Sequence, residues 1–123
     1  MLINFTNHPS QQWKTTQLST AVKQFGKVSD MSFPAIDPEW DDKKIRQLAE
    51  NYHEKIIQKI NDKQKDAVLI MGEHTFSFAL ICKLQKAGIF CYATTSHRIV
   101  TEEEKIKMST FKFERFRKYP PCI

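Results

Sequence analysis

Short apolar runs alternate along the chain with stretches in which apolar residues recur every three or four positions. Residues 2–5, 28–33, 67–71 and 89–94 form the short runs, which are typical of strands in a sheet that is covered on both faces. The stretches between them predict three helices long enough to connect parallel strands. We therefore expect an α/β fold of Rossmann-like type, with a central, mostly parallel sheet and helices on both of its faces.

The expected helices have recognisable ends. Thr15 or Thr16 is suited to cap the start of the first helix, and Gly26 is suited to the left-handed position after its last turn. Asp37 is placed to cap the second helix. Glu73 stands before the third helix, where it can cap the helix or hydrogen-bond a ribose or an adenine amino group.

The last quarter of the chain predicts a β-hairpin. Residues 97–100 and 106–119 have strand patterns, and the acidic segment 101–104 is expected to form the turn between them. Phe116 is out of phase with the alternation that precedes it, which predicts a bulge or a strand end near residues 114–115.

The chain has 123 residues, of which 41% are hydrophobic and 27% are charged. This composition supports one packed core, so we expect a single domain over residues 1–123 and exclude disordered and collagen-like classes. No run approaches the roughly eighteen apolar residues that a membrane span needs. The first residues carry no charged leader or cleavage site, so we expect a cytoplasmic protein without a membrane partner.

The formal net charge of +5 is concentrated in one segment. Residues 105–118 hold six basic residues and one acidic residue, whereas the rest of the chain is balanced. Phe111, Phe113 and Phe116 lie between these basic residues, a pattern that suggests a polyanionic or nucleic-acid partner. The alternative is an exposed strand that its lysines and arginines protect from aggregation.

The cysteines and the common catalytic motifs exclude several classes of site. Cys82, Cys91 and Cys122 are odd in number, show no CxxC spacing and lie in a helix pattern, a strand pattern and the C-terminal tail. We therefore expect neither a structural disulfide nor a zinc site. The sequence contains no P-loop, GxGxxG or GxSxG motif, which removes the commonest nucleotide-binding and hydrolase interpretations.

Polar loops follow three of the expected strands, at residues 7–10, 72–76 and 94–98. In an open parallel sheet, ligands bind at the carboxyl ends of the strands, near the point where the strand order reverses. If the strands lie in the order 2-1-3-4, the three loops converge. The candidate ligand-binding residues are Asn7, His8, Pro9, Ser10, Trp13, Gly72, Glu73, Thr75, Phe76, Thr94, Thr95, Ser96 and Arg98.

These loops offer hydroxyls, helix-start amides, histidines and one arginine, which suit phosphate oxygens and the edges of heterocyclic bases. Glu73 is the only carboxylate in them, whereas magnesium and calcium need several hard oxygen ligands. We therefore expect no metal and no cofactor. His8, His74 and Arg98 are the candidate catalytic residues, because histidine titrates near neutrality and arginine holds phosphate well.

Most of these residues also have a structural interpretation. His8 precedes a proline and either braces a turn or contacts a ligand. His74 fits the capping region of a helix as well as a catalytic role, and Trp13 can cover the end of a core as well as stack on a base. His97 can face solvent on the hairpin, and His53 fits a structural position in the second helix.

Residues 2–13, 71–80 and 88–95, read together, resemble a family of small stand-alone Csx-type proteins associated with type III CRISPR systems. The resemblance covers nearly the whole chain. It implies a Rossmann-like, CARF-like domain that dimerises or forms a higher homo-oligomer and handles cyclic oligoadenylate, the second messenger of this antiviral defence. The recurrent positions of the family correspond to Asn7, His8, Pro9, Trp13, Gly72, Glu73, Thr75, Phe76, Thr94 and Thr95, with no catalytic set to carry over.

We expect a protein that binds cyclic tetra-adenylate and lowers the free signal by sequestration, because the sequence shows neither a paired acid and base nor a metal cluster. The nearest alternative is a metal-independent ring nuclease in which a ribose 2′-hydroxyl attacks the adjacent phosphorus. A general RNA or DNA binder that uses residues 105–118 is a second alternative. A third is an interaction module whose hairpin pairs with another chain by strand addition.

Overall fold

The computed structural model describes residues 1–122, in which five strands form one sheet of order β2-β1-β3-β4-β5. The first four strands are parallel, and β5 is antiparallel to β4. This confirms the expected α/β, Rossmann-like fold class and the strand order 2-1-3-4. The elements are β1 (Leu2–Thr6), η1 (Ser10–Gln12), α1 (Thr15–Phe25), β2 (Val28–Asp30), α2 (Asp42–Lys59), β3 (Ala67–Met71), α3 (His74–Lys86), β4 (Phe90–Glu103) and β5 (Ile106–Lys118).

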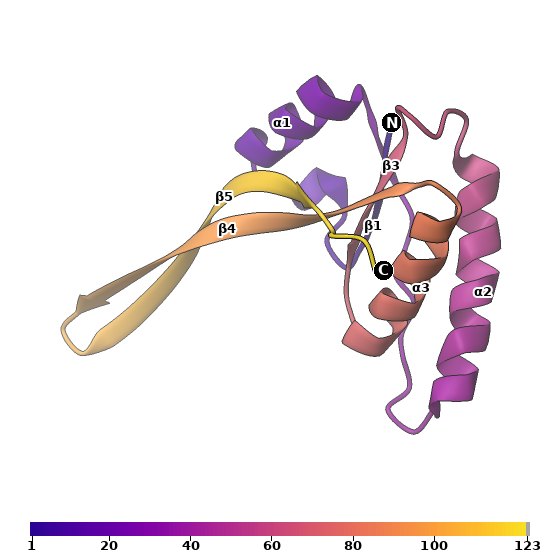
Figure 1. The fold of residues 1–123 in the computed structure, drawn as a ribbon. Coiled ribbons are helices and arrows are strands. Elements are labelled where there is room, and N and C mark those ends of the chain that lie inside the picture. The colour runs from indigo at the N-terminus through magenta and orange to yellow at the C-terminus, as the bar shows by residue number, and fades with distance from the viewer. Residues whose placement is uncertain (123) are drawn as a thin grey trace.

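Helices cover both faces of the sheet, as Figure 1 shows. On one face, α2 and α3 pack against alternate residues of the central strands, with Ile3 of β1 and Ile56 of α2 in the same buried cluster. On the other face, α1 packs through Ala21 against a cluster that contains Leu2 and Phe116. Because β3 is buried on both faces, its sequence is continuously apolar rather than alternating, whereas β1, which is also buried, includes the polar residues Asn4 and Thr6.

The starts of two helices differ from the expected caps. Lys14 is the residue before α1 and its side chain makes no capping hydrogen bond, while Thr15 and Thr16 already belong to the first turn. The cap of α2 is Asp41, whose carboxylate accepts a hydrogen bond from the Lys44 amide at 2.9 Å. Asp37 instead accepts from the Glu39 amide in a separate turn, so the helix begins later than its acidic start suggested. Gly26 confirms its predicted role with a positive φ of 93°.

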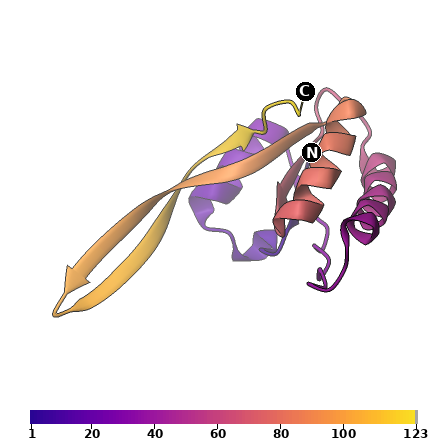
Figure 2. The same ribbon diagram turned by 60° about the horizontal axis from the view of Figure 1, so that its bottom comes forward.

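The hairpin is longer and more continuous than expected. β4 runs unbroken to Glu103, and the turn consists of Glu104 and Lys105 rather than residues 101–104. The predicted bulge is confirmed, because Thr95 pairs with Arg115 whereas Ser96 pairs with Phe113, which leaves one extra residue on β5. Figures 1 and 2 both show the outer part of the hairpin extending well away from the helices.

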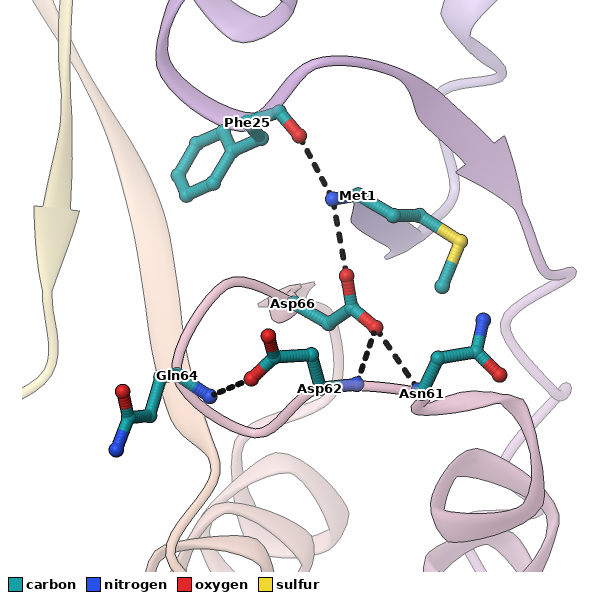
Figure 3. A network of polar contacts seen from close by, with 6 residues as sticks. All are labelled: Met1, Phe25, Asn61, Asp62, Gln64 and Asp66. Atoms are coloured by element: carbon teal, nitrogen blue, oxygen red, sulfur yellow. Dashed lines mark hydrogen bonds and ion pairs between the residues drawn. The ribbon is translucent and has the colours of Figure 1, made fainter.

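The carboxylate of Asp66 fixes the start of the two central strands (Figure 3). It accepts hydrogen bonds from the amides of Asn61 and Asp62 at 2.9 and 3.1 Å and pairs with the Met1 ammonium at 3.1 Å. The ammonium also donates to the Phe25 carbonyl at 2.7 Å. Burial raises the pKa of Asp66, but these donors outweigh it and leave the pKa below its ordinary value.

A disulfide joins Cys82 of α3 to Cys122, which contradicts the expectation that the cysteines form no structural disulfide. The tail folds back over α3 because the Gln85 side chain holds it: its amide nitrogen donates to the Pro120 carbonyl, and its oxygen accepts from the Cys122 amide, both at 2.9 Å. Sequence spacing gave no sign of this reversal. Cys91 remains free and buried. None of the helices within residues 1–122 is long and apolar enough to cross a membrane.

Candidate functional site

A cavity of about 580 Å³ opens at the carboxyl ends of β1, β3 and β4, on the side of the sheet that α1 covers. It lies where the strand order reverses between β1 and β3, the place where α/β sheets bind ligands. From the predicted set, the structure brings His8, Trp13, Gly72, Thr94 and Ser96 together at this cavity.

The loop after β1 is held by a buried polar network. Asn4 is 1% exposed, and its amide nitrogen donates to the His8 carbonyl at 2.9 Å and to the Asp30 carboxylate at 2.8 Å. Thr6 donates to the Asn4 carbonyl oxygen at 2.9 Å, and the Trp13 indole N–H donates to the same His8 carbonyl at 3.0 Å. These bonds fix the backbone of the loop and direct it across the end of the sheet.

Asp30, at the end of β2, anchors the other side of that loop. Its carboxylate accepts from the Ser10 hydroxyl at 2.8 Å and from the Ser10 amide at 3.2 Å, in addition to the Asn4 amide. Partial desolvation raises the pKa of Asp30, but these hydrogen bonds together lower it below its ordinary value. The carboxylate is therefore charged near neutrality, and its oxygens already accept hydrogen bonds from Ser10 of the loop and from Asn4.

The start of α1 supplies the positive part of the cavity. Lys14 and Gln17 line the cavity, and the side chain of Lys14 does not cap the helix. The N–H groups of a first helical turn have no partner within the helix and carry partial positive charge. An uncapped helix start beside a lysine is suited to an anion such as a phosphate.

The remaining walls combine apolar surface with hydroxyls. Met71 and Phe111 line the cavity and are 37% and 58% exposed. The Thr94 hydroxyl donates to the Met71 sulfur at 3.1 Å. Trp13 is half-buried and its ring centre lies 6.2 Å from that of Phe116, so it covers the end of a core while also lining the cavity. Flat apolar side chains of this kind can stack on a heterocyclic base.

Comparison with known proteins places the chain in one family. The family described as the uncharacterized protein MJ1673 family matches residues 1–117. The chain belongs to this family. No curated protein and no solved structure matches the chain.

The structure places several predicted residues away from this cavity. Glu73 caps α3, because its carboxylate accepts from the amides of Thr75 and Phe76 at 2.8 and 3.1 Å. The Thr75 hydroxyl also donates to it, and these bonds together outweigh desolvation and lower the pKa of Glu73. This confirms capping as the role of Glu73. Phe76 is fully buried among Phe5 and other aromatic side chains.

The three candidate catalytic residues do not meet in one cavity. His8 lines the cavity described above, whereas His74 lines a second one of about 640 Å³ beside α3 and the C-terminal tail. Arg98 lies on the hairpin and donates to the Ser109 hydroxyl at 3.1 Å. His8 and His74 therefore line different cavities, and Arg98 lines neither of these two.

Other predicted residues have separate surroundings. Asn7 and Pro9 line a third cavity of about 330 Å³ next to Asp30. The Thr95 hydroxyl donates across the hairpin to the Arg115 carbonyl at 3.3 Å. His97 forms an exposed ion pair with Glu114 at 3.2 Å when the imidazole is protonated. No group of three histidine, cysteine, aspartate or glutamate side chains in the described part of the chain is arranged to hold a metal ion.

The sequence analysis missed several residues that line the cavity. Gln12, Lys14 and Gln17 follow the first loop directly, so their polar character just before and within a helix start was the available signal. The sequence places Phe111 in the basic hairpin, and only the pairing of β5 with β4 brings it over the ends of the parallel strands.

Proposed function

We propose that this chain binds cyclic oligoadenylate, most specifically cyclic tetra-adenylate, in the cavity at the ends of β1, β3 and β4. By holding the messenger, the protein lowers the free signal of type III CRISPR defence in the cytoplasm. The observation that carries the proposal is the combination of an uncapped start of α1, the Lys14 ammonium and exposed apolar side chains around one cavity.

One part of the cavity suits the phosphate of a nucleotide, and another part suits its base. The first-turn amides of α1 and the Lys14 ammonium suit a phosphate. Trp13, Met71 and Phe111 offer apolar surface for an adenine ring. Arg98 pairs with Phe111 across the hairpin and donates to the Ser109 hydroxyl, so it lies outside the lining of this cavity.

A ring of four nucleotides has a rotational symmetry that a dimer can match. Two copies of the cavity related by a two-fold axis would each hold half of the ring, and both halves would meet the same side chains. We therefore include a homodimer in the proposal. A linear adenylate lacks this symmetry and loses half of the matched contacts.

Sequestration is favoured over cleavage because His8, His74 and Arg98 do not share one cavity. The alternative, a metal-independent ring nuclease, needs the 2′-hydroxyl aligned with the phosphorus and nearby groups that stabilise the developing charge. A general RNA or DNA binder is less well supported, because Phe113 and Phe116 of the basic strand are buried and not free to stack on bases.

Binding can be followed through the fluorescence of Trp13. The variant Trp40→Phe leaves Trp13 as the only tryptophan in the chain, and we expect cyclic tetra-adenylate to change its emission and linear tetra-adenylate to do so at least tenfold more weakly. Lys14→Ala in the same background should weaken binding at least tenfold. Lys23→Ala, in the last turn of the same helix, is the matched control and should bind like the parent. Equal affinity for ring and linear adenylate would refute the proposal.

The fate of the ligand separates sequestration from cleavage. Radiolabelled cyclic tetra-adenylate is incubated with excess protein in EDTA, and the products are separated after denaturation. Recovery of the intact ring supports sequestration. Conversion to linear adenylates would establish the nuclease alternative instead.

A further inference from the structure

The outer part of the β4–β5 hairpin, residues 96–113, which we call the arm, exposes unusual apolar surface. Figures 1 and 2 show it extending away from the rest of the molecule. Within it, Ile99, Val100, Met108 and Phe111 are between 45% and 58% exposed. A two-stranded ribbon is only marginally stable in water, and three or more strands are needed for independent stability. The arm is therefore a surface that an additional strand would stabilise.

The two edges of the arm differ in how readily they can pair with an additional strand. The outer edge is β5, which carries Lys107 and Lys112 within the arm, and lysines on an edge strand discourage pairing. The other edge belongs to β4, because β3 pairs with β4 only as far as Tyr92. Along residues 96–103 this edge carries Arg98, Glu102 and Glu103, which are charges of both signs that a second strand can match, whereas the β5 edge of the arm is basic. The β4 edge is thus the one open to a further strand.

The charges on the β4 edge are complementary to those of a second copy. A two-fold axis perpendicular to the ribbon keeps each side chain on its own face, so an antiparallel β4–β4 pair must oppose residues of equal parity. A pair centred on Val100 places Arg98 opposite Glu102 of the partner subunit and His97 opposite Glu103 of the partner subunit. Centring the pair on Arg98 or Glu102 would oppose like charges, which destabilises a strand pair.

We propose that two copies of this chain associate by antiparallel pairing of their β4 edges, centred on Val100, to form a four-stranded ribbon of order β5-β4-β4-β5. The pairing uses the open backbone groups of residues 96–103 and joins the exposed Val100 side chains at the axis. By symmetry, the contact between Arg98 and Glu102 of the partner subunit occurs twice in the dimer.

The same register brings the partner's turn to the cavity. The paired strand ends at Glu103 of the partner subunit, opposite His97, so Glu104 and Lys105 of the partner subunit follow beside Ser96, which lines the cavity at the ends of β1, β3 and β4. Each copy therefore places one acidic residue and that lysine near the rim of the other's cavity. What that lysine contacts rests on the proposed function, whereas the pairing itself does not. In this register the two Ser96 residues lie about 27 Å apart along the ribbon, so the pairing is distinct from a dimer in which two cavities share one ring.

The pairing is tested by sedimentation equilibrium without any adenylate present, so its outcome is independent of ligand binding. We expect the wild-type chain to dimerise and the single variants Arg98→Glu and Glu102→Arg each to weaken the dimer at least tenfold. Mixing the two variants in equal amounts should restore association, because one edge then carries only acidic and the other only basic side chains at these positions. Restoration on mixing also shows that both variants are folded.

Lys112→Glu is the matched control, because it makes the same charge change on the β5 strand of the arm, away from the proposed axis, and should leave the dimer unchanged. Point substitutions are used because deleting residues 105–123 would remove the buried Phe113 and Phe116. A wild-type chain that stays monomeric at every concentration, single variants that dimerise as well as wild type, or a mixture that stays monomeric would each overturn the proposal.

Discussion

Asn4 lies in the middle of β1 with almost no exposed surface, yet each of its polar atoms has a partner. Its amide reaches the His8 carbonyl and the Asp30 carboxylate, and its carbonyl oxygen accepts from Thr6. A polar side chain in a central strand is stable only when its hydrogen bonds are made. Asn4 therefore connects the core of the sheet to the loop that carries His8 and Trp13.

We predict that Asn4→Ala lowers the free energy of unfolding by about 2 kcal/mol, because it removes the hydrogen bonds of the Asn4 amide to the His8 carbonyl and the Asp30 carboxylate and leaves the buried Thr6 hydroxyl without its Asn4 acceptor. It should also weaken cyclic tetra-adenylate binding, since the loop loses its anchor. Urea unfolding monitored by circular dichroism gives the first quantity and the Trp13 titration gives the second. Asn7→Ala, at an exposed position in the same loop, is the control and should change stability little. Equal stability of the two variants would show that the network does not hold the loop.

Gly72 shows a limit of sequence interpretation at the residue scale. It belongs to the predicted ligand-binding set, and it does line the cavity. The structure also shows that a larger residue does not fit here, because a Cβ at this position would overlap the ring of Phe33. Phe33 lies in the connection after β2 and comes close to Gly72 only in the folded chain. No local pattern could have shown this close approach.

At the scale of elements, the hydrophobic periodicity of the sequence predicts those strands and helices whose formation depends on local rules. The strands and helices of the α/β body were identified because burial on one or both faces imposes a period on the sequence. The capping role of Glu73 follows from its own position, and the start of α2 was misplaced because Asp37, Asp41 and Asp42 all resemble caps. Which acid caps the helix depends on where the preceding connection lets the helix begin.

The turn of the arm is strained for its sequence. Glu104 and Lys105 have φ values of 50° and 69°, which is the left-handed region that a two-residue hairpin turn of this kind requires. Asparagine and glycine adopt this region far more readily than glutamate and lysine do. Because the residues around position 103 are acidic, the sequence predicts the turn at residues 101–104 rather than at Glu104 and Lys105.

We predict that the double substitution Glu104→Asn and Lys105→Gly stabilises the arm by about 1 kcal/mol, because it removes the cost of two non-glycine residues in the left-handed region. Hydrogen exchange of the arm amides measures this directly, and exchange at Thr101 and Met108 should slow several-fold. Glu103→Asn is the control, because residue 103 belongs to the strand and has no positive φ. Unchanged or faster exchange in the double variant would contradict the assigned turn geometry.

At the scale of the whole molecule, the convergence of the loops after β1 and β4 could be predicted because parallel strands share a carboxyl edge. The loop after β3 contributes only Gly72 to that cavity, since Glu73 and Phe76 serve α3 and the core. The disulfide between Cys82 and Cys122 could not be predicted, because it depends on the tail returning across α3 to Gln85. Contacts of this kind join residues far apart in sequence and leave no periodic signal.

The disulfide closes a segment with a sequence separation of 40 that contains β4 and β5. Constraining a loop of this size in the unfolded chain is worth on the order of 4 kcal/mol in the chain-entropy model. We predict that Cys122→Ser lowers the melting temperature markedly and that a reducing agent lowers the melting temperature of the wild-type protein by a similar amount. Differential scanning calorimetry with and without reductant measures both shifts.

Comparing cysteine variants with and without reductant separates the loss of the cross-link from other effects of reduction. Cys122→Ser frees the thiol of Cys82, so the double variant Cys82→Ser, Cys122→Ser is the control that lacks both cysteines of the disulfide. The thiol that the double variant keeps, Cys91, is buried, and burial raises its pKa to about 12, so it forms little reactive thiolate in the folded protein. The melting temperature of the double variant should therefore not respond to reductant. Because the Gln85 contacts involve the backbone of the tail, the variant should still fold with the tail against α3. A wild-type melting temperature that is insensitive to full reduction would mean that these contacts, rather than the covalent bond, stabilise the tail.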